Sequence, residues 1–195
     1  MSYGLMPYAV DLAELRSVIG SGSEHSLNAL LRSSWGRELD RLDDLFDGQD
    51  GPSAREAARH LLLGEEYHQR SGALYAYCLK ALLEAHDCAS FLPNGEWYPV
   101  RYDWFDEVRG ELKDGGVSFD PASLTYRGQV VPLPSVDDFP QIGCIEADRA
   151  AELAAEFDAM NEDRIDPQAL DGVREMHGWF RECARTGRGL VTYYH

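Results

Sequence analysis

The sequence is poor in positive charge. Its 195 residues include 18 lysine and arginine residues against 34 aspartate and glutamate residues, which gives a formal net charge of −16. Lysine occurs only at Lys80 and Lys113. Binding an extended phosphate backbone normally requires a clustered basic face. We therefore expect neither nucleic acid nor an anionic membrane surface as a partner.

Long apolar runs are also missing. No stretch approaches the roughly 18 apolar residues that are needed to cross a bilayer, and the first residues lack the charged and apolar segments of a signal peptide. The cysteines form neither a CxxC pair nor a dense disulfide framework; they are Cys78, Cys88, Cys144 and Cys183. These absences predict a cytoplasmic protein with reduced thiols.

The motifs of the common enzyme classes do not occur. The chain has no Gly-x-Ser-x-Gly, P-loop, GxGxxG, HExxH or calcium-loop sequence. Serine hydrolases, NTPases, dinucleotide enzymes and zinc proteases therefore lack their usual anchors here. The sequence predicts no cofactor and no metal.

What the chain does have is the material for a hydrophobic core. Its hydrophobic fraction of 44% is typical of a folded protein, and its length suits a single domain over residues 1–195. Apolar periodicity and capping residues predict mainly helices. The clearest are expected at Ser53–Gly64, at Glu65–His86, and after Asp103, Glu146 and Asp166.

Fewer segments carry strand signals. Gly4–Val10 reads as an edge strand because Pro7 cannot donate a backbone hydrogen bond, and Leu190–Tyr194 reads as a terminal strand. Residues 117–131 predict a hairpin around an Arg-Gly turn. We therefore expect a helix-rich α+β fold with a small mixed sheet, formed by strands at both termini and this hairpin.

The carboxy-terminal third also resembles a known family. Ile142–Ala155 runs from a glycine-containing segment into a helix rich in alanine and glutamate, and Gly178–Tyr194 is a last helix that ends on a short apolar strand. This layout, together with Ser53–Gly64, is similar to that of the YfbM-like family of small bacterial proteins of unknown function. The resemblance implies a single α+β domain and no catalytic residue.

Four residues are candidates for acid, base or nucleophilic chemistry. Glu66 and His68 lie in a Glu-Glu-Tyr-His sequence, which would place a carboxylate and an imidazole on one helix face, although a solvated helix start explains the pattern better than a metal site. His177 falls on an apolar stripe and is expected to be a buried core histidine. Cys144 precedes a helix start that could activate a thiol, but a small buried hydrophobe is the preferred interpretation.

Aromatic residues alternate with charged ones between Asn94 and Trp104. Rigid rings beside an arginine are typical of a binding surface or a pocket wall, although Trp97 and Trp104 could equally fill the end of the core. The residues that we expect to bind a ligand or partner are Tyr77, Trp97, Tyr98, Arg101 and Trp104.

Two functional hypotheses follow. The preferred one is a non-enzymatic interaction protein of the inhibitor or immunity kind, which presents an acidic face and the 97–104 loop to a basic protein partner. The alternative is a small-molecule-binding protein or enzyme, in which Tyr77, Trp97 and Arg101 bind the substrate. In that case Glu66, His68 or His177 moves protons. The sequence leaves open whether the chain is an enzyme.

Overall fold

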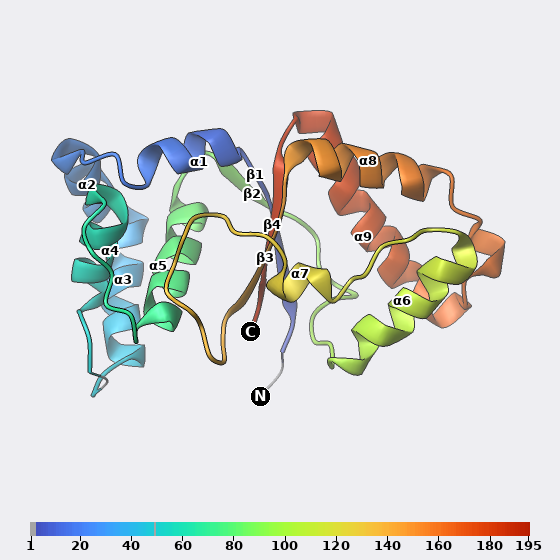
Figure 1. Cartoon of the computed structure of the whole chain (residues 1–195), viewed down its shortest axis with the longest axis horizontal. Helices are drawn as coiled ribbons and strands as arrows, with labels where there is room; N and C mark the ends of the chain where they lie inside the picture. The colour runs from blue at the N-terminus through green and yellow to red at the C-terminus, as the bar shows by residue number, and fades with distance from the viewer. Residues whose placement is uncertain (1–2, 49) are drawn as a thin grey trace. The chain divides into compact units, whose positions relative to one another are not determined.

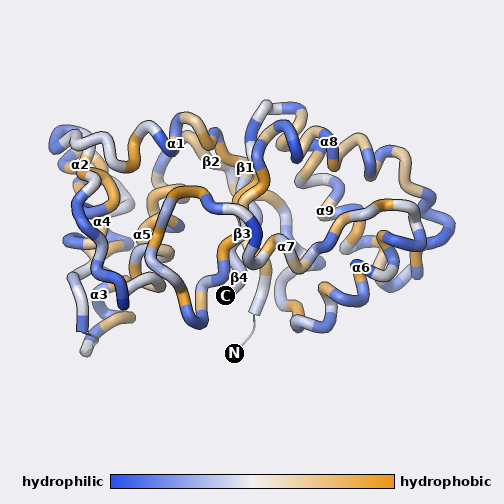
Figure 2. Tube along the Cα trace, in the orientation of Figure 1, coloured by the Kyte–Doolittle hydropathy of each residue, from blue (hydrophilic) through white to orange (hydrophobic). Residues whose placement is uncertain are grey.

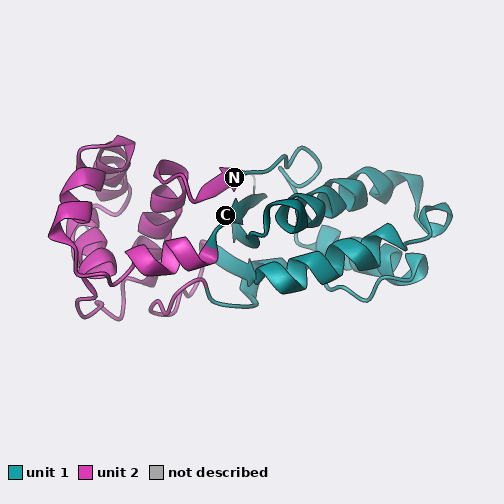
Figure 3. Cartoon of the chain, turned by 90° about the horizontal axis from the view of Figure 1, so that it is seen from above, with its two compact units in different colours: residues 1–11, 91–129, 141–195 teal, residues 12–90, 130–140 magenta. Residues whose placement is uncertain are grey.

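The computed structural model describes residues 3–48 and 50–195. The chain divides into two compact units (Figure 3). Unit 1 contains the segment up to Asp11 together with Phe91–Gln129 and Gln141–His195, and unit 2 contains Leu12–Ser90 and Val130–Pro140. The single domain expected over residues 1–195 stays a prediction.

The strands form one four-stranded sheet with the order β2-β1-β4-β3 (Figure 1). Strand β4 (Gly189–Tyr194) is buried along its whole length and pairs antiparallel with β1 (Leu5–Val10) and with β3 (Gln141–Ile145). Strand β2 is short and spans Ala89–Phe91. The expected strands near both termini are confirmed, and the fold is helix-rich α+β. The sheet is antiparallel, however, and not mixed.

Strand β1 is not the edge strand that Pro7 suggested, because it lies between β2 and β4. The carbonyl of Pro7 accepts a hydrogen bond from the backbone N–H of Leu92 at 2.9 Å. In a strand, the nitrogen and the carbonyl of one residue face the same side, so the nitrogen of Pro7 faces away from β4. The missing donor thus falls on the side of the short strand β2, where it breaks no bond to β4.

The expected hairpin at residues 117–131 is wrong: the structure has helix α7 (Ser123–Tyr126) and no strand there. Asp120 starts the helical turn, since its carboxylate accepts the N–H of Ala122 at 3.1 Å and its carbonyl accepts the hydroxyl of Ser123 at 2.6 Å. The carbonyl of Leu124 accepts a hydrogen bond from the hydroxyl of Thr192. Local side-chain bonds and packing against β3 and β4 therefore override the strand signal of the β-branched residues.

The remaining helices of unit 1 are α6 (Asp103–Gly115), α8 (Ala147–Asp158), the short 3₁₀ helix η1 (Glu162–Arg164) and α9 (Pro167–Thr186). Helices α8 and α9 pack along each other (Figure 1). As expected, α9 opens on a capping Asp166 followed by Pro167, and it ends at Gly187, whose φ of 67° is left-handed. Its buried stripe consists of Ala169, Gly172, Val173, Met176, Trp179, Phe180 and Cys183.

Unit 2 is helical and is organised around α5 (Gly72–Ala85). The other helices are α1 (Leu12–Val18), α2 (Glu24–Leu31), α3 (Ser34–Leu45) and α4 (Ala54–Leu63). Both α3 and α4 pack on α5, and the indole N–H of Trp35 donates to the carbonyl of Cys78 at 3.2 Å. Hydrophobic and hydrophilic residues alternate along these helices (Figure 2), as expected for helices with one buried face. Within the described ranges, no helix is long and apolar enough to span a bilayer.

Candidate functional site

The loop between Pro93 and Tyr102 in unit 1 is tied to the elements around it. The carboxylate of Glu175 on α9 accepts the backbone N–H groups of Gly95 and Glu96 at 2.9 and 2.8 Å. The side-chain amide of Asn94 donates to the carbonyl of Leu5 at 3.0 Å, and the N–H of Leu5 donates to the carbonyl of Trp97 at 2.8 Å. These hydrogen bonds hold the loop against α9 and β1.

Trp97 belongs to the core and not to a binding surface. Its side chain is completely buried, and its indole N–H donates to the carbonyl of Gly172 at 2.9 Å. Its ring packs against Trp179 and Phe105, with centroid distances of 5.6 and 5.4 Å. Of the two interpretations that the sequence left open, the structure supports the core-filling one for this residue.

Trp104 lies differently, because its side chain is only partly buried. Its ring rests over Gly172, where a Cβ atom would come within 2.8 Å of Cζ2. The ring of Trp97 lies beside it, with the centroids 6.3 Å apart. The indole nitrogen of Trp104 is buried and has no hydrogen-bond partner among the described residues. Packing alone therefore positions this ring.

A cleft of about 280 Å³ opens beside Trp104, and we call it the loop cleft. It is lined by Glu96, Pro99, Val100, Arg101, Asp103, Trp104 and Glu107. Within the described part of the chain, no ion pair involves Arg101 or any of the three carboxylates, which are those of Glu96, Asp103 and Glu107. Arg109, the next cation on α6, differs in this respect, because it pairs with Asp106 and Asp120 at 2.8 and 2.7 Å. The loop cleft thus holds three uncompensated carboxylates around an aromatic ring.

Two tyrosines of the same loop are exposed to solvent. Tyr98 is 47% exposed and Tyr102 is 49% exposed. The ring of Tyr98 lies against the backbone of Gly4, a position at which a larger residue would collide with it. The ring of Tyr102 contacts Phe105 and Tyr194, with centroids 5.5 and 6.3 Å apart. Each ring thus packs against the protein and is also exposed to solvent.

A second cleft, the histidine cleft, lies in unit 2 over the segment between α4 and α5. Glu65–His68 was expected on a helix, but it is irregular chain, because Gly64 ends α4 in a left-handed conformation and α5 begins only at Gly72. The expected helix over Glu65–His86 is thus wrong in its first seven residues. Glu66 and His68 do not share a helix face.

Tyr75 on α5 holds this segment in place. Its buried hydroxyl oxygen accepts the backbone N–H of His68 at 2.9 Å and lies 2.7 Å from Nδ1 of His60. The hydroxyl group thus joins the side chain of His60 to the backbone of His68. Burial raises the pKa of Tyr75, an effect partly offset by the bond from His68, so the hydroxyl keeps its proton.

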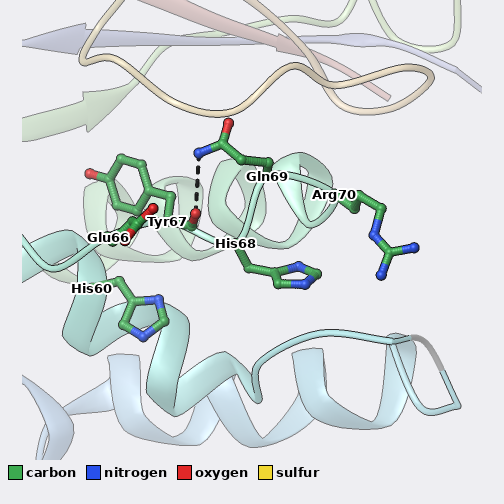
Figure 4. A pocket seen from close by; sticks show the side chains of 6 residues that line it. All are labelled: His60, Glu66, Tyr67, His68, Gln69 and Arg70. Carbon is green, nitrogen blue, oxygen red and sulfur yellow. Dashed lines mark hydrogen bonds between the residues drawn. The ribbon is translucent and has the colours of Figure 1, made fainter.

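The histidine cleft measures about 510 Å³ and brings Glu66 and His68 together (Figure 4). In this view the ring of His68 lies between the ring of His60 and the guanidinium of Arg70. Nδ1 of His68 is 2.9 Å from the hydroxyl of Ser71, which leaves Nε2 as its remaining nitrogen. The arrangement offers donors and acceptors to a small polar molecule. In the described part of the chain, no group of three or more metal-ligating side chains is found.

His177 is not the buried core residue that its spacing suggested. Its side chain is 13% exposed, its Nε2 lies 3.0 Å from a carboxylate oxygen of Asp158, and its ring contacts Phe157. The buried stripe of α9 runs through Met176 and Phe180, so His177 lies at its edge. It contacts Asp158 and Phe157 of α8 from the partly buried edge of α9.

Cys144 lies on β3, buried between Gly143 and Ile145, and it precedes the start of α8 as expected, because Glu146 is the N-cap residue of that helix. Its backbone N–H donates to the carbonyl of Arg127 at 2.8 Å. The preferred interpretation of Cys144 as a small buried residue agrees with this position. All four cysteines are buried thiols.

Tyr77 packs on Phe46 within unit 2, with the ring centroids 6.0 Å apart. Burial, followed by the carboxylate of Asp138, raises its pKa. Unit 2 thus holds Glu66, His68 and Tyr77, while Trp97, Tyr98, Arg101 and Trp104 belong to unit 1. The one-pocket site of the enzyme hypothesis stays a prediction.

Sequence reasoning missed three important residues. Tyr102 and Glu107 belong to the loop surface, and Tyr75 anchors the histidine cleft. Glu107 could have been found, because it lies three residues after Trp104 on the expected helix and so shares its face. Tyr75 could not, since the hydroxyl contacts that define its role depend on the path of the irregular segment 65–71.

Comparison with known proteins gives one match. The profile of a domain family described as a domain of unknown function (DUF7691) matches residues 1–195. No curated protein and no solved structure matches the chain. The resemblance to the YfbM-like family stays a prediction. Because the match covers the whole sequence, the chain belongs to the DUF7691 family of unknown function.

Proposed function

We propose that this protein is a non-enzymatic interaction protein that binds a basic protein partner, in the manner of an inhibitor or immunity protein. The binding region is the loop surface, which consists of the loop cleft together with Tyr98 and Tyr102. One observation carries the proposal: carboxylates without an ion pair lie beside exposed tyrosines, where a loop held by hydrogen bonds runs into the start of α6.

The tyrosines supply the contact energy in this proposal. Tyrosine is enriched at protein interfaces because its ring buries a large area at a low cost in conformational entropy, while its hydroxyl still hydrogen-bonds. Tyr98 and Tyr102 rest on the backbone of Gly4 and on neighbouring rings, so little side-chain freedom is lost when a partner covers them.

The carboxylates attract a basic partner electrostatically. Glu96, Asp103 and Glu107 outnumber the single cation of the cleft, and the whole chain carries a net charge of −16. A field of this sign accelerates encounters with a basic partner and slows those with an acidic one. The association rate should therefore fall several-fold as salt is raised from about 50 mM to about 500 mM.

The experiment is affinity capture from a lysate of the native host, with wild-type protein and the double variant Tyr98→Ala/Tyr102→Ala as baits. We expect wild type to retain a basic protein in a stoichiometric amount, and the double variant to lose it. Tyr126→Ala is the matched control, because Tyr126 is 61% exposed in the same unit but lies on α7, outside the loop surface. Equal capture by all three baits, or capture of no basic protein, contradicts the proposal.

A second candidate function is binding of a small polar molecule in the histidine cleft. It is favoured by one observation, that Glu66 and His68 line the same cleft (Figure 4). Native mass spectrometry of freshly purified protein tests it. A bound mass of a few hundred daltons that is lost in His68→Ala supports this function, and its absence from wild type counts against it.

A further inference from the structure

We infer that the loop cleft binds a single arginine side chain of the protein partner, an inference that rests on the function proposed above. The cleft offers the three features that recognise a guanidinium group: an aromatic face, surrounding carboxylates, and a narrow concave space. These features come from different parts of unit 1.

The aromatic face is the ring of Trp104. Trp is the best of the aromatic side chains for holding a cation over its face, and a guanidinium can stack on it flat. The ring is held close to α9, since its Cζ2 lies 2.8 Å from the position that a Cβ of residue 172 would take. On the core side it meets the completely buried ring of Trp97. Trp104 is thus supported by Gly172 and Trp97 and also lines the cleft.

The carboxylates come from two elements. Glu96 belongs to the loop, and its backbone N–H is fixed by Glu175, whereas Asp103 and Glu107 lie one turn apart at the start of α6. None of them has a cationic partner in the described part of the chain. Three like charges around one cleft repel one another, and an entering cation relieves that repulsion.

The dimensions favour arginine over a larger or a differently shaped cation. The cleft of about 280 Å³ is the size of one side chain and not of a folded segment. Arginine has a planar fork of donors that can address carboxylates on different sides while the same plane stacks on the indole, whereas lysine offers a compact, strongly hydrated ammonium. Arg101 lines the same cleft without an ion pair, so an incoming arginine meets one like charge at its edge.

The test uses the indole N–H signal of Trp104 in NMR spectra of the ¹⁵N-labelled full-length protein, assigned by its loss in Trp104→Phe. Three blocked tripeptides are titrated, Gly-Arg-Gly, Gly-Lys-Gly and Gly-citrulline-Gly, where citrulline is the neutral isostere of arginine. We expect the arginine peptide to shift the Trp104 signal saturably, the lysine peptide to bind more weakly, and the citrulline peptide to leave the signal in place.

Charge variants then separate the cleft from the general acidity of the chain. Glu107→Gln should weaken binding of the arginine peptide roughly two- to fivefold, as expected for the loss of one exposed ion pair. Arg101→Gln should strengthen it. Asp114→Asn is the matched control, because Asp114 is exposed on the same helix but does not line the cleft, and it should leave the affinity unchanged.

Several outcomes overturn the inference: an unshifted Trp104 signal, equal shifts with arginine and citrulline, tighter binding of lysine, or an equal loss in Glu107→Gln and Asp114→Asn. If any of these occurs while a basic protein is still captured in a manner that depends on Tyr98 and Tyr102, arginine recognition is wrong and the proposed function stands. If the capture fails as well, both are wrong.

Discussion

At position 172 the absence of a side chain decides how Trp104 lies. A Cβ atom there would come within 2.8 Å of Cζ2 of the ring, so Gly172→Ala forces the indole to move. We expect this variant to be destabilised by about 1–3 kcal/mol, the usual cost of overpacking, and to lose the concave shape of the loop cleft. Denaturant unfolding measures the free energy, and tryptophan fluorescence reports the displaced ring.

Gly178 provides the control on the same helix. No atom lies within 4 Å of a Cβ at this position, and Gly178 is inside α9. Gly178→Ala should therefore stabilise the protein by about 0.5–1 kcal/mol, because alanine has the higher helix propensity. Equal effects of the two substitutions would show that backbone propensity, and not the contact with Trp104, dominates at Gly172.

The hydroxyl of Tyr75 is a second single group on which a site depends. Tyr75→Phe leaves the ring in place but removes the oxygen that joins Nδ1 of His60 to the N–H of His68. Both groups are partly buried and then lose a partner, so we expect a loss of about 1–3 kcal/mol in the free energy of unfolding. Hydrogen exchange should also accelerate at the amide of His68.

Tyr67→Phe is the matched change for this experiment. The ring of Tyr67 packs on that of Tyr75 with centroids 4.8 Å apart, but its hydroxyl makes no hydrogen bond among the described residues. We expect its stability to stay within about 0.5 kcal/mol of wild type. A comparable loss in both variants would mean that ring packing, and not the hydroxyl, holds the segment.

Among the elements, α4 has the most complete start. The hydroxyl of Ser53 accepts the N–H of Glu56, while the carboxylate of Glu56 accepts the N–H of Ser53 at 2.8 Å, and these bonds lower the pKa of Glu56. Ser53→Ala should reduce the stability to unfolding by about 1 kcal/mol, as measured for other N-cap residues. Ser118→Ala, at an exposed position outside any helix, should change little, and an equal loss there would contradict the capping explanation.

Sequence reasoning succeeded for elements whose ends are marked by local chemistry. The capping box of Ser53 and the Asp166-Pro167 start both specify a helix boundary through bonds within four residues. It failed where the decisive contact is distant. Leu124 lies in α7 and not in a strand, and its carbonyl accepts a hydrogen bond from the distant Thr192. Strand β3 was not among the predicted strands, since its pairing with β4 spans more than forty residues.

The candidate site shows the same division. The 97–104 loop was found because aromatic and charged residues adjoin in the sequence, yet which ring faces the core could not be predicted. Trp97 is buried and donates a hydrogen bond to the carbonyl of Gly172, whereas Trp104 lies over the same residue and is only partly buried. His177 was placed on the buried stripe, but that stripe is rotated by about one residue along α9. A spacing pattern cannot fix such a rotation.

For the whole molecule, the buried thiols predict a loss of stability in alkali. Burial raises the pKa of Cys183 to about 12 from an ordinary value of 9.0, and burial likewise raises that of Cys78. A group whose folded pKa is raised contributes stability that is fully present below its unfolded pKa and is lost as the pH rises through the folded pKa. The window therefore begins near pH 9 and extends to about pH 12. Near pH 10.5 the expected loss is about 2 kcal/mol for each thiol.

Denaturant unfolding of wild type and Cys183→Ala at about pH 7.5 and about pH 10.5 checks this prediction. The variant starts from a lower stability, because it loses buried sulfur packing, but its further loss in alkali should be smaller than that of wild type. The buried and partly buried tyrosines whose pKa values are also raised contribute equally to both proteins. Identical alkaline losses would show that Cys183 is already solvated.

The strand order has a consequence for how the chain folds during synthesis. Strand β4 bonds to β1 on one side and to β3 on the other, yet it is made after both. While a ribosome is still adding residues before Gly189, β1 and β3 have no common neighbour, and the sheet of unit 1 must wait. The helices of unit 2 have all been made by residue 85 and are free to pack earlier. A nascent chain stalled before Gly189 should therefore expose β1 to chaperones.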